Sequence, residues 1–129
     1  MDSSSQCHLT MQGRTTQQVL QDHLDRAQRG DLDADIERNF DPDCVLMTTY
    51  GTFRGHEGVR EAAALLARQM GAGGYRYLKQ EWHEELAFLE WTVDNDRVSI
   101  PDGADSYWIR DGRIRAMTIH YSVRDKHGA

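Results

Sequence analysis

Hydrophobic residues recur three and four positions apart in the first half of the chain, the spacing that places them on one face of a helix. The first such stretch follows Thr15 and Gln18, which have the spacing of a capping box, and it ends at Gly30. A second, short stretch ends at Asp41-Pro42, because proline disfavours a helical predecessor and donates no hydrogen bond. We therefore predict helices over residues 15–30, 31–39 and 56–70.

The pattern changes after Gly71-Ala72-Gly73-Gly74, where β-branched and aromatic residues predict strands. Asp111-Gly112 is a two-residue hairpin signal between the last two of them. An earlier strand is predicted over Cys44–Tyr50, before a turn at Gly51–Gly55. The later strands are expected over residues 75–82, 86–94, 97–109 and 113–124. Early helices and late strands predict an α+β fold with the helices packed on one face of a curved sheet.

Composition and charge narrow the class of protein. The 129 residues allow one domain, and a content of 39% hydrophobic and 28% charged residues is ordinary for a globular protein. The net charge of −6 argues against nucleic-acid binding, which needs Lys and Arg to displace counterions from phosphates. No apolar run approaches the roughly 20 residues of a membrane helix, and the polar N-terminus lacks a secretory signal. Because two cysteines cannot form a disulfide framework, we expect a cytoplasmic protein with free thiols and no membrane partner.

Several segments, taken in order, resemble the NTF2-like superfamily, and within it the SnoaL-like and ketosteroid-isomerase-like branch. They are Gly30–Asp33, Phe40–Val45, Phe53–Val59 and Asp102–Ile114. The resemblance implies a cone-shaped fold in which three N-terminal helices pack on a strongly curved, mostly antiparallel sheet. It covers about residues 15–124, so we expect one domain over 15–125 between a flexible tail at 1–14 and a short tail at 126–129.

Members of this superfamily include isomerases, polyketide cyclases, dehydratases, epoxide hydrolases and non-catalytic subunits, most of them homodimers. The resemblance aligns the family carboxylate on the strand before the last hairpin with Asp105. The family's general-base aspartate falls at Thr48, and its oxyanion-hole tyrosine falls at His23. Because two of these three positions differ, steroid isomerisation by the family's mechanism is not the predicted reaction.

Two carboxyl groups are candidate acids or bases. Strand alternation and the resemblance place Asp105 toward an apolar cavity, where burial favours the neutral form. The alternative is that Asp105 belongs to the polar turn begun at Asp102 and caps backbone amides. Glu90 shares a strand face with Phe88, and two carboxyls in one pocket would divide into one acid and one base. The alternative for Glu90 is a solvated face or an ion pair with Arg115.

Two further residues are candidates for orienting or polarising a substrate. His23 lies on the first predicted helix, where a neutral imidazole donates a hydrogen bond or carries a proton, unless it is a plain packing residue. Tyr50 would orient a carbonyl through its hydroxyl, unless it is a core aromatic residue. The pocket wall is expected to contain Leu20, Leu46, Thr48, Phe88, Tyr107, Met117, Ile119 and Tyr121.

The outer face of this sheet is commonly the dimer interface in the family, so the resemblance implies a homodimer interface through Trp108, Thr118 and His120. The alternative for His120 is that a bulge in the strand turns it toward the pocket. No metal or cofactor is predicted, because the chain has no HxxxH or CxxC pair and its glycine-rich segment follows a helix instead of opening one. The leading hypothesis is a cofactor-independent enzyme that moves protons on a small apolar or carbonyl-containing molecule. The alternatives are a non-catalytic protein that binds a small apolar ligand, and a dimeric interaction module without a pocket.

Overall fold

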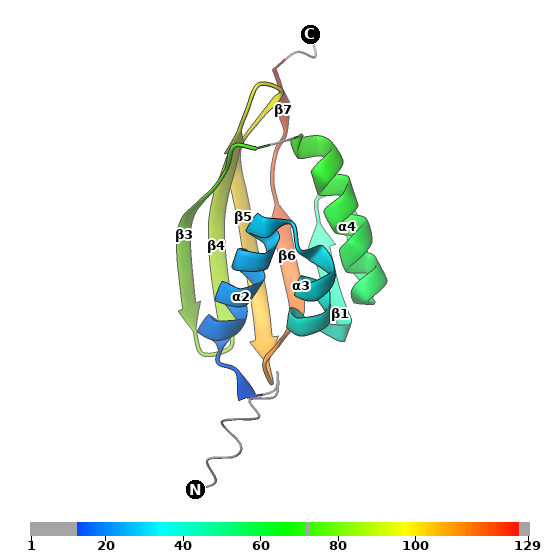
Figure 1. Cartoon of the computed structure of the whole chain (residues 1–129), viewed down its shortest axis with the longest axis vertical. Helices are drawn as coiled ribbons and strands as arrows, with labels where there is room; N and C mark the ends of the chain where they lie inside the picture. Colours follow the sequence, from blue (N-terminus) through cyan, green and yellow to red (C-terminus); the bar gives the residue numbers. More distant parts are fainter. Residues whose placement is uncertain (1–12, 72, 127–129) are drawn as a thin grey trace, which may run out of the picture.

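The computed structural model describes residues 13–71 and 73–126, in which three helices lie on one face of a curved sheet (Figure 1). The strands follow the order β2-β1-β6-β5-β4-β3, and the short β7 pairs with β5. Only β1 and β6 run parallel among the described strands, so the sheet is mostly antiparallel, as predicted. The elements are α2 (Thr16–Arg29), α3 (Leu32–Asn39), β1 (Phe40–Thr48), β2 (Gly51–Arg54), α4 (Gly55–Met70), β3 (Tyr75–His83), β4 (Leu86–Asp94), β5 (Val98–Arg110), β6 (Arg113–His120) and β7 (Arg124–Asp125).

Both ends of α2 have the predicted caps. The Thr15 side chain accepts a hydrogen bond from the Gln18 backbone N–H, and the Gln18 side chain accepts one from the Thr15 N–H. Gly30 ends the helix with a φ of 72°, a left-handed conformation that glycine adopts without a steric penalty. These caps fix the length of α2, and with it the position of His23 against the sheet.

Three boundaries differ from the prediction, the first being the start of β1 at Phe40 instead of Cys44. β1 ends at Thr48, so Tyr50 lies in a turn and Gly51–Arg54 forms the short strand β2. The reason is local, because the Thr48 hydroxyl donates to the Gly51 carbonyl and accepts from the Tyr50 N–H, which closes a tight hairpin. The last predicted strand is divided into β6 and β7. Asp111 and Gly112 have positive φ angles of 53° and 74°, which confirms the predicted hairpin turn.

The first residues that the structure describes are anchored to the domain. Arg14 donates to the Asn39 side chain at 2.8 Å and to the carbonyls of Arg38 at 2.7 Å and Gly112 at 2.9 Å. The N-terminal tail predicted at 1–14 therefore does not include Arg14, while residues 1–12 and most of the predicted C-terminal tail lie outside the described residues. No helix in the described ranges is long and apolar enough to span a membrane.

The core lies between the helices and the covered face of the sheet. Buried and exposed residues alternate along β4 and β5, as expected for strands with one covered face. On the covered face, Gly103 of β5 pairs with Trp91 of β4, and the indole ring lies directly over the glycine. A Cβ atom at Gly103 would stand 2.2 Å from the ring, so Trp91 keeps its position only because residue 103 has no side chain.

We predict that Gly103→Ala destabilises the fold by roughly 1–3 kcal/mol, because the indole or the strand must move to admit the methyl group. Urea unfolding followed by circular dichroism measures the change. Ser106→Ala, on an exposed position of the same strand, is the matched control and should leave the midpoint nearly unchanged. Equal midpoints for the Gly103 variant and the wild type would show that Trp91 does not pack on this glycine.

Candidate active site

Asp105 is buried on the covered face of β5, with 5% of its surface exposed. The Trp91 Nε1–H donates to its Oδ1 at 2.9 Å, and the Tyr107 hydroxyl donates to its Oδ2 at 3.2 Å. The expected orientation of Asp105 toward the interior is thus observed, and the turn-capping alternative does not hold. Each carboxylate oxygen has one neutral donor, and no cation forms an ion pair with Asp105 among the described residues.

Burial raises the pKa of Asp105 to about 6, because the charged form loses its hydration in this apolar environment. The hydrogen bond from Trp91, the charge of His23 and the hydrogen bond from Tyr107 oppose the increase without cancelling it. Burial, followed by the nearby Asp105 charge, raises the pKa of Tyr107 well above its ordinary value. Asp105 is therefore the group of this cluster that exchanges a proton close to neutral pH, and Tyr107 stays a donor.

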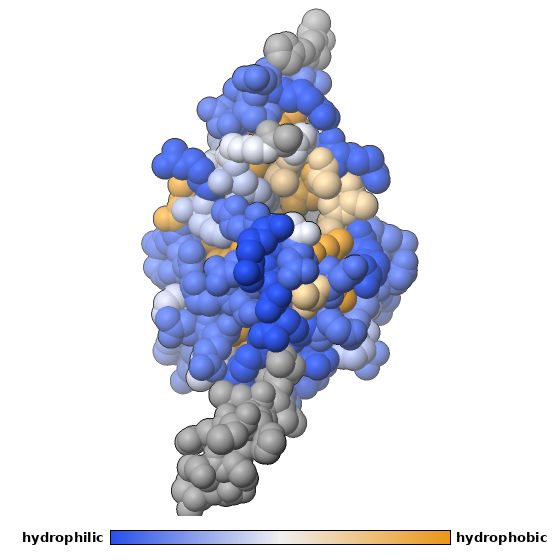
Figure 2. Space-filling view, viewed as in Figure 1, coloured by the Kyte–Doolittle hydropathy of each residue, from blue (hydrophilic) through white to orange (hydrophobic). Residues whose placement is uncertain are grey.

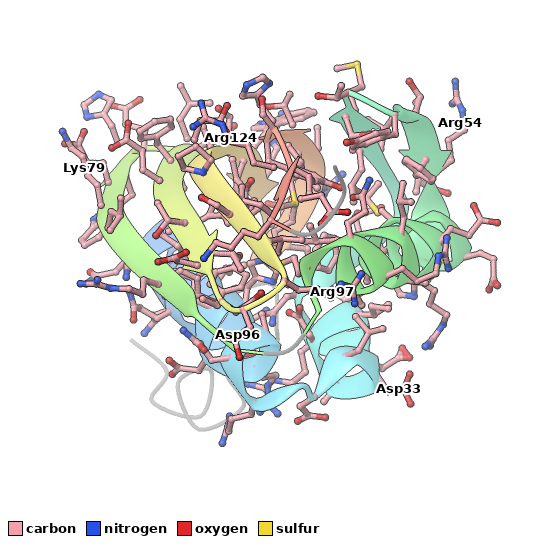
Figure 3. The ribbon with its side chains drawn as sticks, turned by 90° about the horizontal axis from the view of Figure 1, so that it is seen from above. Asp33, Arg54, Lys79, Asp96, Arg97 and Arg124 are labelled. Carbon is pink, nitrogen blue, oxygen red and sulfur yellow. The ribbon has the colours of Figure 1, made fainter. Side chains whose placement is uncertain are left out.

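Aromatic rings fill the space around this carboxyl. Trp91 stacks on Tyr75 with ring centroids 5.1 Å apart and contacts Tyr121 at 5.7 Å. Seen from above, side chains crowd the space between helices and sheet, while the charged Asp33 and Arg54 point outward (Figure 3). The cone interior next to Asp105 is thus packed, and the wide hollow that the fold resemblance implies is not present there.

A narrow crevice of about 10 Å³ lies between α4 and strands β1, β2 and β6, and Asp105 does not line it. That volume is close to the minimum needed for one water molecule, so the crevice as it stands has no room for a larger ligand. Ile119 connects the crevice to the acid, because it lines the crevice and is the cross-strand partner of Asp105. The crevice is lined by Thr48, Phe53, Ala62, Leu65, Leu66, Ile119 and Tyr121.

Helix α4 forms one wall of this crevice. The Tyr121 hydroxyl donates to the Gln69 side chain, and the Tyr121 ring contacts the Tyr50 ring at 5.6 Å. Apolar surface is exposed over the C-terminal half of the helix, where Ala64 and Ala67 face solvent (Figure 2). Two side-chain contacts at Tyr121 therefore close the crevice at its outer end.

His23 lies on the covered side of the sheet, in α2. Its Nδ1 is 2.8 Å and 3.0 Å from the two carboxylate oxygens of Asp35 in α3. Its ring packs edge-on against Phe40 at 5.4 Å and against Tyr107 at 5.6 Å. Burial disfavours the charged ring, but the charge and hydrogen bond of Asp35 outweigh it and raise the pKa of His23.

Most of the predicted pocket residues are on the covered face. Thr48, Ile119 and Tyr121 line the crevice, whereas the remaining inward residues are packed in the core. Those packed residues are Leu20, Leu46, Tyr107 and Met117. The covered face thus brings them together with Asp105 and His23, and their contact with a ligand stays a prediction.

Three predicted site residues are elsewhere. Glu90 and Phe88 were expected to line the cavity, but they are on the uncovered face of β4, and Glu90 is exposed. The physical reason is the alternation along β4, because Leu89 and Trp91 occupy the covered face and their neighbours Phe88 and Glu90 must then point to the other face. A shift of one residue in the expected alternation exchanges the two faces. The expected catalytic Tyr50 is 45% exposed in its turn and reaches the site only through the Tyr121 ring.

The residues predicted for an interface lie on the uncovered face of the sheet. Trp108 is 41% exposed there, Thr118 is exposed, and His120 forms an ion pair with Asp102 at 3.6 Å. A groove of about 340 Å³ opens where β3 turns into β4, and Leu86 lies on its wall. Ser106 and Tyr107 of the neighbouring β5 also line it. Neither Asp105 nor His23 lines this groove, but Tyr107, whose hydroxyl donates to Asp105, does.

Sequence reasoning missed Trp91 as a hydrogen-bond donor and Asp35 as a partner of His23. The signal for Trp91 was its alternation with Leu89, which places it on the covered face beside Asp105. Asp35 gave only a weak signal, a charged residue next to the apolar Ile36 in a short helix. No group of three metal-ligating side chains is found in residues 13–71 and 73–126.

Solved structures share the fold at low sequence identity. A protein from Kribbella flavida DSM 17836 is 17% identical with a TM-score of 0.70, covering 81% of this chain and 84% of its own. A putative polyketide cyclase from Sinorhizobium meliloti is 20% identical with a TM-score of 0.64, covering 79% and 93%. An LEH-like epoxide hydrolase from M. tuberculosis is 19% identical with a TM-score of 0.58, covering 81% and 80%.

The search of curated proteins found no match to this chain. The model of the SnoaL-like domain matches residues 20–117, a range that runs from α2 into β6 and contains the buried acid and its histidine. This range covers most of the chain, and its helices and curved sheet are those of the similar structures. The protein therefore belongs to the SnoaL-like domain family, with the NTF2-like fold.

Proposed function

We propose that this protein is a cofactor-independent enzyme that transfers protons on a small, largely apolar carbonyl compound, with Asp105 as the acid and base. The observation that carries the proposal is a carboxyl group buried among aromatic rings with a pKa of about 6. Such a group is ionised in enough molecules to accept a proton and, once protonated, acidic enough to return it. The polyketide cyclase and epoxide hydrolase among the similar structures support a small-molecule enzyme on this fold.

The chemistry needs no further component. The Asp105 carboxylate takes a proton from the carbon next to a carbonyl, and the electron pair of that C–H bond moves toward the carbonyl oxygen. The protonated acid then returns its proton to a different carbon, which gives an isomerisation or prepares a ring closure. Burial keeps bulk water from competing for this proton.

A non-catalytic binding protein is the second candidate function. It is favoured by Thr48, which stands where the family's general-base aspartate would be, and by the small volume of the crevice. Turnover and affinity separate the two functions, because removing the acid abolishes catalysis while a neutral pocket still binds an apolar ligand.

We predict that the wild-type protein accelerates hydrogen exchange at the carbons next to the carbonyl of cyclohexanone in D2O, followed by proton NMR. Asp105→Asn should lower that rate by roughly 10²–10⁴-fold, because the amide neither accepts nor returns the proton. Glu90→Gln, which removes an exposed carboxylate on the uncovered face, is the matched control and should keep the wild-type rate. Equal rates for Asp105→Asn and wild type would exclude Asp105 as the base. A wild-type rate no higher than that of acetate would favour the binding protein.

The raised pKa also predicts a pH-dependent cost to stability. The folded protein holds the Asp105 proton more tightly than the unfolded chain, whose carboxyl titrates near its ordinary value of 3.8. The free energy of unfolding therefore loses a contribution as pH rises from about 4 to about 6, and keeps it at lower pH. Between pH 4 and 7, Asp105→Asn should gain on the order of 2–3 kcal/mol relative to wild type. Urea unfolding at several pH values measures the difference, and a pH-independent difference would contradict the raised pKa.

We also propose a homodimer formed through the uncovered face of the sheet, as the family resemblance implies. Leu86 and Trp108 are cross-strand neighbours there, 62% and 41% exposed, and they stand beside the 340 Å³ groove. Exposed large apolar side chains that adjoin each other are typical of interaction surfaces.

Replacing both Leu86 and Trp108 by lysine should convert a dimer into a monomer, because like charges would then meet across the two-fold axis. Sedimentation velocity at micromolar concentration measures the mass. Ala64→Lys, an exposed change on α4 in the opposite layer, should leave the dimer intact. A wild-type protein that sediments as a monomer, or a double variant that remains a dimer, would refute this interface.

A further inference from the structure

His23 is bound by the carboxyl group of Asp35, which has no role in the proposed reaction as described above. Its Nδ1 lies within hydrogen-bond distance of both oxygens of Asp35, and both side chains are buried. An ionised carboxylate only accepts hydrogen bonds, so Nδ1 carries a proton. Nε2 is then the ring nitrogen left for a substrate, since no described residue bonds to it.

Asp35 is itself fixed in place. The Asn39 side-chain amide donates to Asp35 at 2.9 Å and to Asp22 at 2.8 Å, and Arg14 donates to the Asn39 oxygen at 2.8 Å. Burying an ion pair costs hydration that well-packed apolar residues would not lose, so such a network is weak evidence for a role in stability. Its geometry instead constrains one imidazole to one orientation.

The other side of His23 adjoins the proposed acid. The His23 ring packs edge-on against the ring of Tyr107, whose hydroxyl donates to Asp105, and the charge of His23 acts on Asp105. Asp35, His23 and Asp105 therefore follow one another across the covered face, from α3 through α2 to β5. Asp35 forms its ion pair with His23, whereas Asp105 receives hydrogen bonds only from the neutral Trp91 and Tyr107.

We propose that Asp35 is a positioning residue for the proposed proton transfer: it holds the His23 ring so that Nε2–H donates to the substrate's carbonyl oxygen while Asp105 takes the carbon-bound proton. This inference rests on the proposed function. The C–H proton goes to Asp105, its electron pair forms the enol, and the Nε2 proton goes to the enol oxygen. Both protons return when the carbonyl re-forms, so the enzyme ends unchanged.

The ionisable groups around this unit come from several elements. Asp22 and Asp35 act on His23 from the helices, and Asp105 acts on it from β5. Tyr75 and Tyr77 on β3 stay protonated near neutral pH because burial, followed by the charge of Asp105, raises their pKa values. Burial also raises the pKa values of Tyr107 and Tyr121, so both stay protonated near neutral pH. The remaining titratable groups of this unit are Asp105, with a pKa of about 6, and His23, whose pKa is raised by the charge and hydrogen bond of Asp35 against the effect of burial.

Two measurements test the proposal. The first is nitrogen-15 NMR of the unmodified protein, in which the His23 ring, assigned by comparison with His23→Gln, should carry its neutral-form proton on Nδ1. The second is the pH profile of cyclohexanone exchange. A donor must be protonated, so the rate should fall as pH rises through the pKa of His23. Asp35→Asn keeps the shape but removes the charge, and should move that fall to lower pH.

We expect Asp35→Asn to lower kcat by roughly 10–100-fold with little change in KM, because it alters how the proton is presented and leaves the apolar pocket intact. Glu37→Gln, an exposed change on the same helix, is the matched control and should keep both the rate and the pH profile. A merely structural Asp35 would affect unfolding without moving the profile.

The outcomes separate this inference from the proposed function. If wild type exchanges, Asp105→Asn does not, and Asp35→Asn keeps the wild-type rate and profile, the positioning role of Asp35 is wrong and the proposed function stands. A neutral His23 with its proton on Nε2 also overturns the positioning role. Absence of exchange in wild type removes the proposed function and this inference with it.

Discussion

The packing on the covered face of this sheet depends on the burial of Asp105, which costs the carboxyl group its hydration and gives it only neutral hydrogen-bond donors in return. Each contact of Asp105 is made by a ring that also belongs to the core, since Trp91 and Tyr107 pack as hydrophobic residues and donate through their polar ends. Gly103 leaves the space in which the Trp91 indole lies. The pairing of β4 with β5 is therefore needed to place the donors around Asp105 as well as to form the sheet.

The helices, in contrast to the sheet, bury charged groups as ion pairs. His23 and Asp35 are buried as a pair, whereas Asp105 has no ion-pair partner in the described part of the chain. Hydrogen bonds from Arg38, Asn39 and Arg26 outweigh burial and lower the pKa of Asp22 to about 2, so it stays ionised. The helical side of the interior thus holds the ionised Asp22, and β5 holds a carboxyl group whose pKa lies at about 6. That division is what an acid-base site requires.

Local signals in the sequence predicted the frame well. The capping box, Gly30 and Asp111-Gly112 each act over a few residues, and all three have the predicted structure. Strand alternation grouped Asp105 with Tyr107, and the family resemblance placed that side toward the interior, where the structure has it. The same combination failed at Glu90, because β4 carries apolar residues in both phases and its pattern alone does not select the covered face. The pairing of His23 with Asp35 joins two helices, and no local spacing encodes it.

The closed interior and the raised pKa of Asp105 have the same cause, and this limits which ligands the site accepts. Water or a strongly polar ligand beside Asp105 would restore hydration to the carboxylate and return its pKa toward 3.8. A ligand beside Asp105 must therefore replace the apolar lining with apolar surface of its own. Under the proposed mechanism it also carries one oxygen that accepts from the Nε2–H of His23. A small hydrophobic molecule with a single carbonyl group meets both conditions, whereas a sugar or a phosphate ester fails the first.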